Sequence, residues 1–334
     1  NRLRAFAMHS HTTTIFNQLL DFVPKDKFNR FVGQHNADRY VKSLTTWNQF
    51  VALLYAQATG KESLREIETG FLAHQNTWYH LGIQSVARST LSDANLRRDW
   101  HIFHDLFGEI LTRCRDVTPT HNKFAFDNPL YALDATTISL CLSIFDWAKY
   151  RTTKGALKLH TLLDVRTAIP EIIVATDGKT SDITAGRKLD LSTLEKGSIV
   201  AIDRGYIDYG WWRVLDARGL FFVSRSKTTT AITRLGEHRP PDTGRGILKD
   251  DRVFIGEHYG YEKYQKAVRM VTYHDREKSQ TYVYLTNNFT LSAVEIANIY
   301  KHRWQVELFF KWVKQHLKIK TFLGTSKNAV LTQI

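Results

Sequence analysis

Near residue 129 the hydrophobic pattern of this chain changes, and that change limits the folds open to it. Before this point, apolar residues recur three and four positions apart, as in helices, for example from Ile15 to Phe22. After it come short β-rich runs bounded by Gly, Asp or Lys, at 131–136, 157–163, 170–175 and 198–203. A helical stretch at 208–218 and another strand at 220–225 follow. Strands that alternate with helices predict an α/β layer structure.

The same pattern divides the chain into three predicted parts. Residues 1–125 are expected to form an all-α N-terminal domain, whose spacing fits DNA binding and ordinary helix packing equally well. Residues 226–286 contain a Pro-Pro pair, several Gly and two strand candidates, and are interpreted as a β-rich insertion. The α/β core then comprises residues 126–225 and 287–334, on both sides of that insertion.

Capping signals predict where two of the helices begin. Ser292 is followed three residues later by Glu295, the pattern of a capping box, and helical spacing continues from there to about Leu317. Ser92 and Asp93 are expected to cap an earlier helix. The helix that begins at Ser292 is the longer of the two, and it carries most of the charged residues near the end of the chain.

The charge balance points to a polyanionic partner. The formal net charge is +13, and residues 301–334 hold seven Lys or Arg against one acid, Glu307. Nucleic acid is the commonest partner of so basic a chain, although ribosomal and membrane-surface proteins share this property. A lone glutamate among so many bases is a candidate functional residue.

Composition also limits the location and the kind of site. No stretch approaches the roughly 18 apolar residues that a membrane helix needs, and no secretory signal is expected. Cys114 and Cys141 lack metal-site spacing, so two reduced core cysteines are expected. These features predict a cytoplasmic protein without a membrane partner.

The strongest local signal lies on the predicted helix near the end of the chain. At about 100° per residue, its polar side chains fall in one stripe about 80° wide, and apolar residues occupy most of the remaining surface. The members of the stripe are Tyr300, Arg303, Glu307, Lys311 and Lys314. A solvated face of an amphipathic helix is the ordinary interpretation. The stripe is narrow for that role, and its bases could bind phosphates beside one carboxylate that holds a metal.

Two further carboxylates follow apolar β-rich runs. Asp134 stands in Ala-Leu-Asp-Ala-Thr and Asp203 in Ile-Val-Ala-Ile-Asp-Arg-Gly-Tyr. Singly, each fits a turn or a cap, but α/β folds also place their chemistry at strand ends. With Glu307 they form a three-carboxylate set, which suits two divalent ions about 3.5–4 Å apart. Oxygen ligands without Cys or paired His favour Mg²⁺ or Mn²⁺ over Zn²⁺.

Other titratable residues compete for such a role. Asp164, Asp177 and Asp182 also flank strands, but turns after strands favour Asp for conformational reasons. His101 and His104 lie three apart in a helix rich in Trp and Phe, and a satisfied helix face accounts for them better than a metal site.

The motifs of this chain resemble those of a known family. They are Asp134, the run Asp203-Arg-Gly-Tyr, the spacing Tyr300-x2-Arg303-x3-Glu307-x6-Lys314, and the segment Lys154-Gly-Ala-Leu-Lys158-Leu-His160. Together they resemble bacterial insertion-sequence transposases of the insertion-sequence-four type, over about residues 129–334. The Tyr-Arg-Glu-Lys spacing matches at every step and is the most specific of these signals.

This resemblance implies a ribonuclease-H-like catalytic core, a β-rich insertion before the last catalytic helix, and cut-and-paste DNA transposition. It implies that Asp134, Asp203 and Glu307 hold two Mg²⁺ or Mn²⁺ ions. The expected partners are the terminal inverted repeats and target DNA, bound by a homodimer in a bacterial, nucleoid-associated protein.

The resemblance also extends to residues outside the three carboxylates. Lys158 and His160 match the family's segment after the first aspartate, and are expected to bind DNA with the basic stripe. Related enzymes place a Trp in the insertion to stack on a base flipped out of DNA. The position 25 residues before Glu307 is Tyr282 here, which can also stack.

Two other functions remain open at this level. A ribonuclease-H-like nuclease would cut without joining, and a domesticated relative would bind DNA without catalysis. Three intact carboxylates disfavour the silent protein, and the Tyr-Arg-Glu-Lys helix favours a transposase over a simple nuclease.

Overall fold

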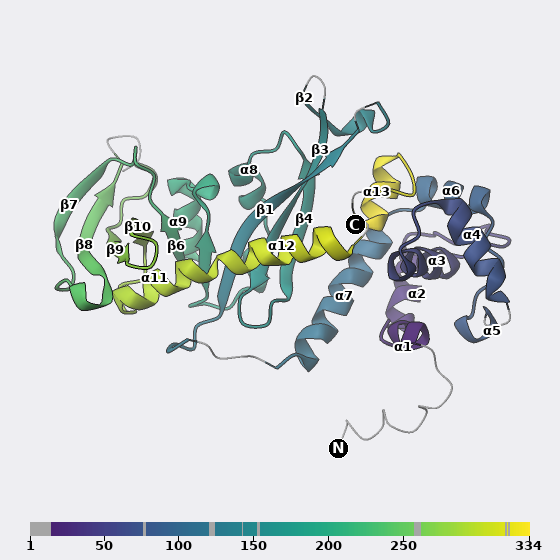
Figure 1. The fold of residues 1–334 in the computed structure, drawn as a ribbon, viewed down its shortest axis with the longest axis horizontal. Helices are drawn as coiled ribbons and strands as arrows, with labels where there is room; N and C mark the ends of the chain where they lie inside the picture. Colours follow the sequence, from purple (N-terminus) through teal and green to yellow (C-terminus); the bar gives the residue numbers. More distant parts are fainter. Residues whose placement is uncertain are drawn as a thin grey trace, which may run out of the picture.

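The computed structural model of the chain describes residues 15–75, 78–119, 124–141, 143–151, 154–256, 262–317, 319 and 321–334. The first part is helical (Figure 1). Its helices are α1 (Ile15–Asp21), α2 (Lys25–Gln34), α3 (Thr46–Thr59), α4 (Leu64–Ala73), α5 (Trp78–Leu81), α6 (Arg88–Arg97) and α7 (His101–Val117). They pack around two apolar clusters, one near Val51 and Leu91 and the other near Phe28 and Ile102.

One helix start in this part differs from the prediction. Ser92 and Asp93 do not cap a helix; they lie inside α6, whose Leu91 and Ala94 face the interior. The next helix, α7, begins at His101, eight residues after Asp93, and there Asp99 accepts the backbone N–H of His101 at 3.0 Å. Helical burial at three-residue spacing therefore outweighed the preference of Ser and Asp for a cap.

Ten strands form one sheet in the described part of the chain. They are β1 (Leu130–Leu140), β2 (Lys149–Arg151), β3 (Lys154–Asp164), β4 (Pro170–Asp177), β5 (Ile199–Ile202), β6 (Phe221–Arg225), β7 (Ile232–Glu237), β8 (Ile247–Ile255), β9 (Val268–Asp275) and β10 (Gln280–Thr286). Their order is β2-β3-β1-β5-β6-β10-β9-β8-β7, and β4 pairs with β3. Strands β1, β5 and β6 are parallel, and the other pairs are antiparallel. The fold is therefore mixed α/β, built on one large mixed sheet.

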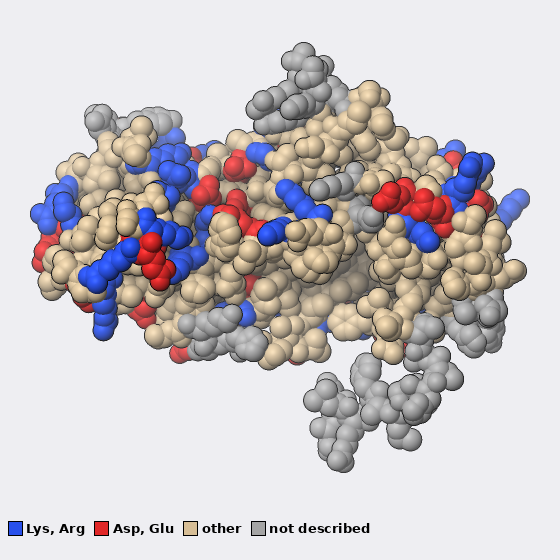
Figure 2. All heavy atoms as spheres, viewed as in Figure 1, with Lys and Arg blue, Asp and Glu red and all other residues tan. Residues whose placement is uncertain are grey.

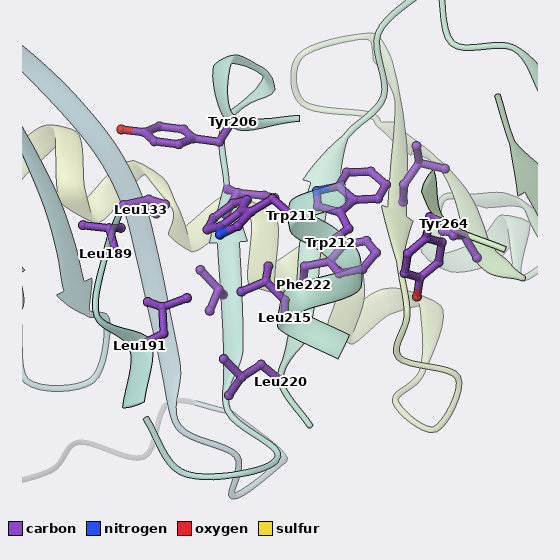
Figure 3. Packing of buried hydrophobic residues seen from close by; sticks show 14 of the residues in the cluster. Leu133, Leu189, Leu191, Tyr206, Trp211, Trp212, Leu215, Leu220, Phe222 and Tyr264 are labelled. Carbon is purple, nitrogen blue, oxygen red and sulfur yellow. The ribbon is translucent and has the colours of Figure 1, made fainter. Parts of the chain in front are cut away.

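The parallel strands are buried because helices cover both faces. The helices of this half are α8 (Asp182–Gly186), α9 (Tyr209–Ala217), α11 (Ala293–His302), α12 (Trp304–His316) and α13 (Lys327–Gln333). All four residues of β5 are buried, as expected for a strand covered on two sides. On one face, Trp212 of α9 stacks on Phe222 of β6 with ring centroids 4.2 Å apart (Figure 3). On the opposite face, α11 and α12 bury Ile296, Val306 and Phe310.

The segment predicted as a β-rich insertion contains four antiparallel strands, β7 to β10. Two of them match the predicted strands, and β10 pairs with β6, so the four strands extend the same sheet. A buried ion pair joins Arg269 of β9 to Asp250 of β8 at 2.7 Å, with exposed fractions of 0% and 1%. Arg269 also donates to the carbonyl of Leu291 at 2.6 Å. This side chain therefore fixes the loop before α11 to the sheet extension.

The long helix predicted near the end of the chain is divided in two. The predicted capping box is present: Ser292 accepts the N–H of Glu295, and the Glu295 carboxylate accepts the N–H of Ser292. Between α11 and α12, the N–H of Arg303 donates to Tyr300, three residues back, where a regular α-helix would use the fourth. This tightened turn separates the two helices at Arg303, a residue of the polar stripe.

The last helix links the N-terminal helices to the sheet. The α13 residue Asn328 donates to the carbonyl of Asn95 in α6 at 2.9 Å, and its side-chain oxygen accepts the N–H of Trp100. Val330 of the same helix packs with Ile138 of β1. In Figure 1, α13 accordingly lies between α6 and the sheet. Among the described helices, none combines the length and the apolar character needed to cross a bilayer.

Candidate active site

The two predicted aspartates lie side by side on neighbouring strands. In the parallel pair β1–β5, Leu133 lies opposite Ile202, so the next residues along the two strands are Asp134 and Asp203. Side chains alternate along a strand, and Ala132 and Ala201 both face α11 and α12. Asp134 and Asp203, two positions further on, therefore point toward the same helices.

Their local settings differ from each other and partly from the prediction. Asp203 directly follows β5 and caps a 3₁₀ turn, η4 (Arg204–Tyr206), by accepting the N–H of Gly205 at 3.4 Å. Asp134 was expected at a strand end, but β1 continues to Leu140 because its pairing with β3 extends that far. Asp134 instead marks the point where pairing of β1 with β5 stops.

An arginine joins Asp134 to Glu307. From the turn between α11 and α12, the two terminal nitrogens of Arg303 donate separately, to Asp134 Oδ2 at 2.7 Å and to Glu307 Oε1 at 2.5 Å. The side chains of Arg303, Asp134 and Glu307 are 13%, 20% and 36% exposed. We call this arrangement the Arg303 bridge. It brings together residues separated by more than 160 positions in the sequence.

The charges at this site act on one another. Burial raises the pKa of Asp134, and the negative charge of Asp203 raises it further, whereas the N–H of Ala135 and Arg303 oppose these effects. Burial would lower the pKa of Arg303, but its hydrogen bond to Glu307 and the nearby carboxylates raise it, so the guanidinium stays charged. Burial raises the pKa of Tyr300, Arg303 opposes this effect, and the negative charge of Asp203 adds to it. These effects indicate that Asp203 faces the same space as the Arg303 bridge.

The carboxylates match Mg²⁺ or Mn²⁺ in their chemistry, since all their donor atoms are oxygens. In the described residues, however, no three His, Cys, Asp or Glu side chains are arranged to hold a metal ion. The Arg303 guanidinium lies between Asp134 and Glu307, and its Nε is buried without a hydrogen-bond partner. Two of the three carboxylates, Asp134 and Glu307, thus already bind a cationic group, the guanidinium of Arg303.

A row of tyrosines extends from the Arg303 bridge toward the sheet extension. The guanidinium of Arg303 lies 5.7 Å from the ring centroid of Tyr300, which lies 5.0 Å from that of Tyr284. Tyr282 follows, with its centroid 6.1 Å from Tyr284 and the planes nearly parallel. Tyr282 therefore connects to the site through Tyr284, and it is partly exposed.

The sequence alone did not single out Arg225. This residue stands beside Asp203 on the next strand, as Asp203 stands beside Asp134. Because Ile202 pairs with Ser224, Arg225 is the β6 neighbour of Asp203. Its guanidinium stacks on Tyr282 at 4.7 Å, and it forms no ion pair with a described carboxylate. The sequence does place Arg225 at the end of a predicted strand. Only the β5–β6 register shows that this strand end lies beside Asp203.

Lys158 and His160 lie elsewhere, on the opposite face of the sheet. Lys158 pairs with Asp182 at 3.1 Å. His160 is fully buried, between the Tyr206 hydroxyl at 2.9 Å and the Thr176 hydroxyl at 3.0 Å. Burial lowers the pKa of His160 to about 4, so it is neutral near pH 7. From this interior position it cannot touch DNA; it supports the turn that follows Asp203.

The two lysines of the predicted stripe lie along α12. Lys311 is exposed and Lys314 is partly buried. Much of the apolar surface of this helix is exposed: Trp304 and Trp312 are 57% and 52% exposed, and Leu308 is 48% exposed. The polar stripe thus runs between a buried face and an exposed apolar face, because the sheet covers only one side of α12.

The competing residues have local structural roles. Asp164 accepts the N–H of Arg166, Asp177 accepts that of Thr180, and Asp182 pairs with Lys158. His101 and His104 each contact a neighbouring aspartate on the helical part of the chain. The cysteines are free, as expected, but Cys141 is exposed on the surface where a core position was expected.

Two parts of the chain match known protein families. Residues 125–334 match the family described as Transposase DDE domain, and residues 11–84 match a domain of unknown function. A putative transposase of Sinorhizobium fredii is 32% identical over 75% of this chain and 68% of its own length. A probable insertion-sequence transposase of Geobacillus stearothermophilus is 27% identical over 76% and 65%, and one of Synechocystis is 26% identical over 75% and 69%.

The first family covers more than half of the chain and includes every residue of the Arg303 bridge. The chain therefore belongs to the DDE transposase family. Its function is DNA transposition, an enzymatic activity that cuts DNA strands and joins them to new sites.

Proposed function

We propose that this protein is a cut-and-paste transposase of the insertion-sequence-four type, in which Asp134, Asp203 and Glu307 hold two Mg²⁺ or Mn²⁺ ions. The observation that carries this proposal is the meeting of three distant segments at one point. The β1–β5 register places the aspartates together, and the Arg303 bridge joins Glu307 to Asp134. The Tyr-Arg-Glu-Lys spacing of the sequence supports the finer family assignment.

The proposal includes a ribonuclease-H-like core made of residues 126–225 and 287–334. Support comes from the sheet, in which β4, β3, β1, β5 and β6 are neighbours in this order and only the last three run parallel. Residues 1–125 are the helical N-terminal domain, and residues 226–286 are the β-rich insertion, which lengthens the core sheet at β6.

The proposed chemistry assigns separate tasks to the residues of the site. Bound divalent ions would activate the attacking oxygen and stabilise the leaving oxygen of a phosphodiester. The three carboxylates hold these ions, and the burial of Asp134 restricts water around them. Arg303 suits the scissile phosphate, since a guanidinium fork can hold two phosphate oxygens. The Tyr300 hydroxyl orients the strand beside it.

The DNA would lie across the surface that contains Arg225, Tyr282 and the polar stripe of α12. Figure 2 shows Lys and Arg over the lobe of β7 to β10 and along the middle of the molecule, where α12 runs. Tyr282, partly exposed with Arg225 stacked on it, presents an aromatic surface to an unpaired base. We extend the proposal to a homodimer that joins two element ends in a nucleoid-associated complex.

The first test separates joining from cutting. Duplexes carrying the inverted repeats that flank the gene are incubated with the protein and a target plasmid. Chelation should stop all reaction, and Mg²⁺ or Mn²⁺ should restore both cleaved ends and ends joined to the plasmid. Metal-dependent cleavage without any joined product would favour the nuclease. Cleavage that persists with excess chelator would contradict the metal assignment.

A second expected result concerns the basic stripe. Lys314→Ala should weaken binding to end DNA and unrelated DNA alike, and lower the slope of log K against log salt by about 0.9, the loss of one phosphate contact. Fluorescence anisotropy across a salt series measures this. The control is Lys196→Ala, an exposed lysine at the amino end of β5, at the opposite end of the strand from Asp203. Equal slopes for both variants would reduce the stripe to a solvated helix face.

A further inference from the structure

The Arg303 bridge holds the same oxygens that the proposed metal needs. Asp134 Oδ2 and Glu307 Oε1 each accept one hydrogen bond from a single guanidinium. Two partly buried carboxylates repel each other, and the positive charge between them offsets that repulsion. A divalent ion would satisfy the same need with a higher charge. The guanidinium and the metal therefore compete for one position.

The structure also shows that the guanidinium is incompletely satisfied where it lies. Arg303 Nε is buried without a hydrogen-bond partner, whereas both terminal nitrogens are bonded. A phosphate presents several acceptors in the geometry that a guanidinium fork prefers. Arg303 also occupies the tightened turn between α11 and α12, where it is the C-cap of the first helix and the N-cap of the second, so it is not one of the buried residues that pack either helix.

We propose that Arg303 is an exchangeable counter-ion, which neutralises Asp134 and Glu307 before metal binds and moves to a DNA phosphate afterwards. The inference rests on the proposed function, since it takes these carboxylates as the metal ligands. Its consequence is a coupling between two ligands. DNA draws Arg303 away and frees the carboxylates for metal, and metal releases Arg303 for DNA. Thermodynamic linkage requires the two effects to be equal in size.

The test measures binding, without reference to catalysis. Mn²⁺ affinity is determined by electron paramagnetic resonance of the free ion, with and without a random-sequence DNA duplex. The duplex should tighten Mn²⁺ binding by about tenfold, within the range of roughly 5–150-fold found for coupled sites. Anisotropy titrations should show that Mn²⁺ tightens duplex binding by the same factor.

Two matched variants locate the coupling. Arg303→Gln should bind Mn²⁺ about tenfold more tightly in the absence of DNA, close to the affinity of the duplex-bound wild type, and the duplex should add little further. Arg225→Gln removes a neighbouring guanidinium that pairs with no described carboxylate. It should weaken duplex binding but keep the coupling. Simple attraction between phosphate and metal would instead leave the coupling intact in both variants, and that result would overturn the proposal.

Further controls separate this inference from the function beneath it. If Arg303→Gln fails to fold by circular dichroism, Arg303→Lys answers the question, because a lysine keeps the charge but lacks the two-nitrogen fork. The Mn²⁺ affinity of Arg303→Lys should lie between those of the wild type and Arg303→Gln. If its Mn²⁺ affinity and its coupling to DNA both equal the wild-type values, the proposed exchange of Arg303 is contradicted. Failure of the metal site itself gives a different result: Asp203→Asn would then bind Mn²⁺ as the wild type does.

Discussion

Asp203→Asn is expected to abolish DNA cleavage, with a fall of at least about a thousandfold, equivalent to about 4 kcal/mol in the barrier. Asparagine keeps an oxygen that can accept the N–H of Gly205, so the turn after β5 should stay folded. It loses the negative charge that a metal ligand needs. DNA binding should change little, because it depends on basic residues. End cleavage and anisotropy on the same preparation measure the two quantities.

The matched control for this change is Asp164→Asn. Asp164 also caps a turn after a strand, by accepting the N–H of Arg166 at 2.7 Å, but it does not take part in the Arg303 bridge. The Asp164→Asn variant should cleave DNA as the wild type does. Asp134→Asn and Glu307→Gln should behave as Asp203→Asn does. Normal cleavage by Asp203→Asn on authentic end DNA would remove the central claim of the proposed mechanism.

The second large effect concerns stability. Arg269→Met should lower the free energy of unfolding by about 3–5 kcal/mol, because it leaves the Asp250 carboxylate buried and unpaired. It also removes the hydrogen bond from Arg269 to the carbonyl of Leu291, which holds the loop before α11. Urea unfolding followed by circular dichroism gives the change.

Two comparisons identify the cause of that effect. The double change Arg269→Met with Asp250→Leu should recover part of the loss, since no charge then remains unpaired. Lys27→Met removes a partly exposed ion pair with Glu109 and should cost less than about 1 kcal/mol. If Arg269→Met costs no more than Lys27→Met, the buried pair does not stabilise the sheet extension as argued.

Several features of the fold could be predicted from the sequence because they depend on local patterns. The β-rich runs at 131–136 and 198–203 became β1 and β5, and the Ser292 capping box starts α11 as expected. The three carboxylates could be selected from the sequence because Asp134 and Asp203 follow apolar runs and Glu307 is the one acid on a basic helix face. Family resemblance then linked them, although their distance in the sequence is large.

Other features depend on strand register, which a single sequence does not reveal. Lys158 and His160 share a motif with the family, but the pairing of β3 with β1 places them on the face away from Glu307. A shift of one residue would have reversed this outcome. Arg225 escaped notice for the same reason, since its neighbour Asp203 is 22 positions away and meets it only through the β5–β6 pairing. The Arg303 bridge could not be predicted either, because it depends on how α11 and α12 pack on the sheet beside Asp134.

The continuous pairing of β5, β6 and β10 has a mechanical consequence. Arg225 pairs with Tyr284, so Tyr282 stands two strands across from Asp203 and two residues along β10. With strands about 4.8 Å apart and about 3.4 Å per residue, these offsets are roughly 10 Å and 7 Å. Backbone hydrogen bonds fix both of them. The sheet therefore fixes the span between these two positions. A nucleotide stacked on Tyr282, as proposed above, would lie at a set distance from Asp203, and strand exchange would have to move the DNA relative to this fixed pair of positions.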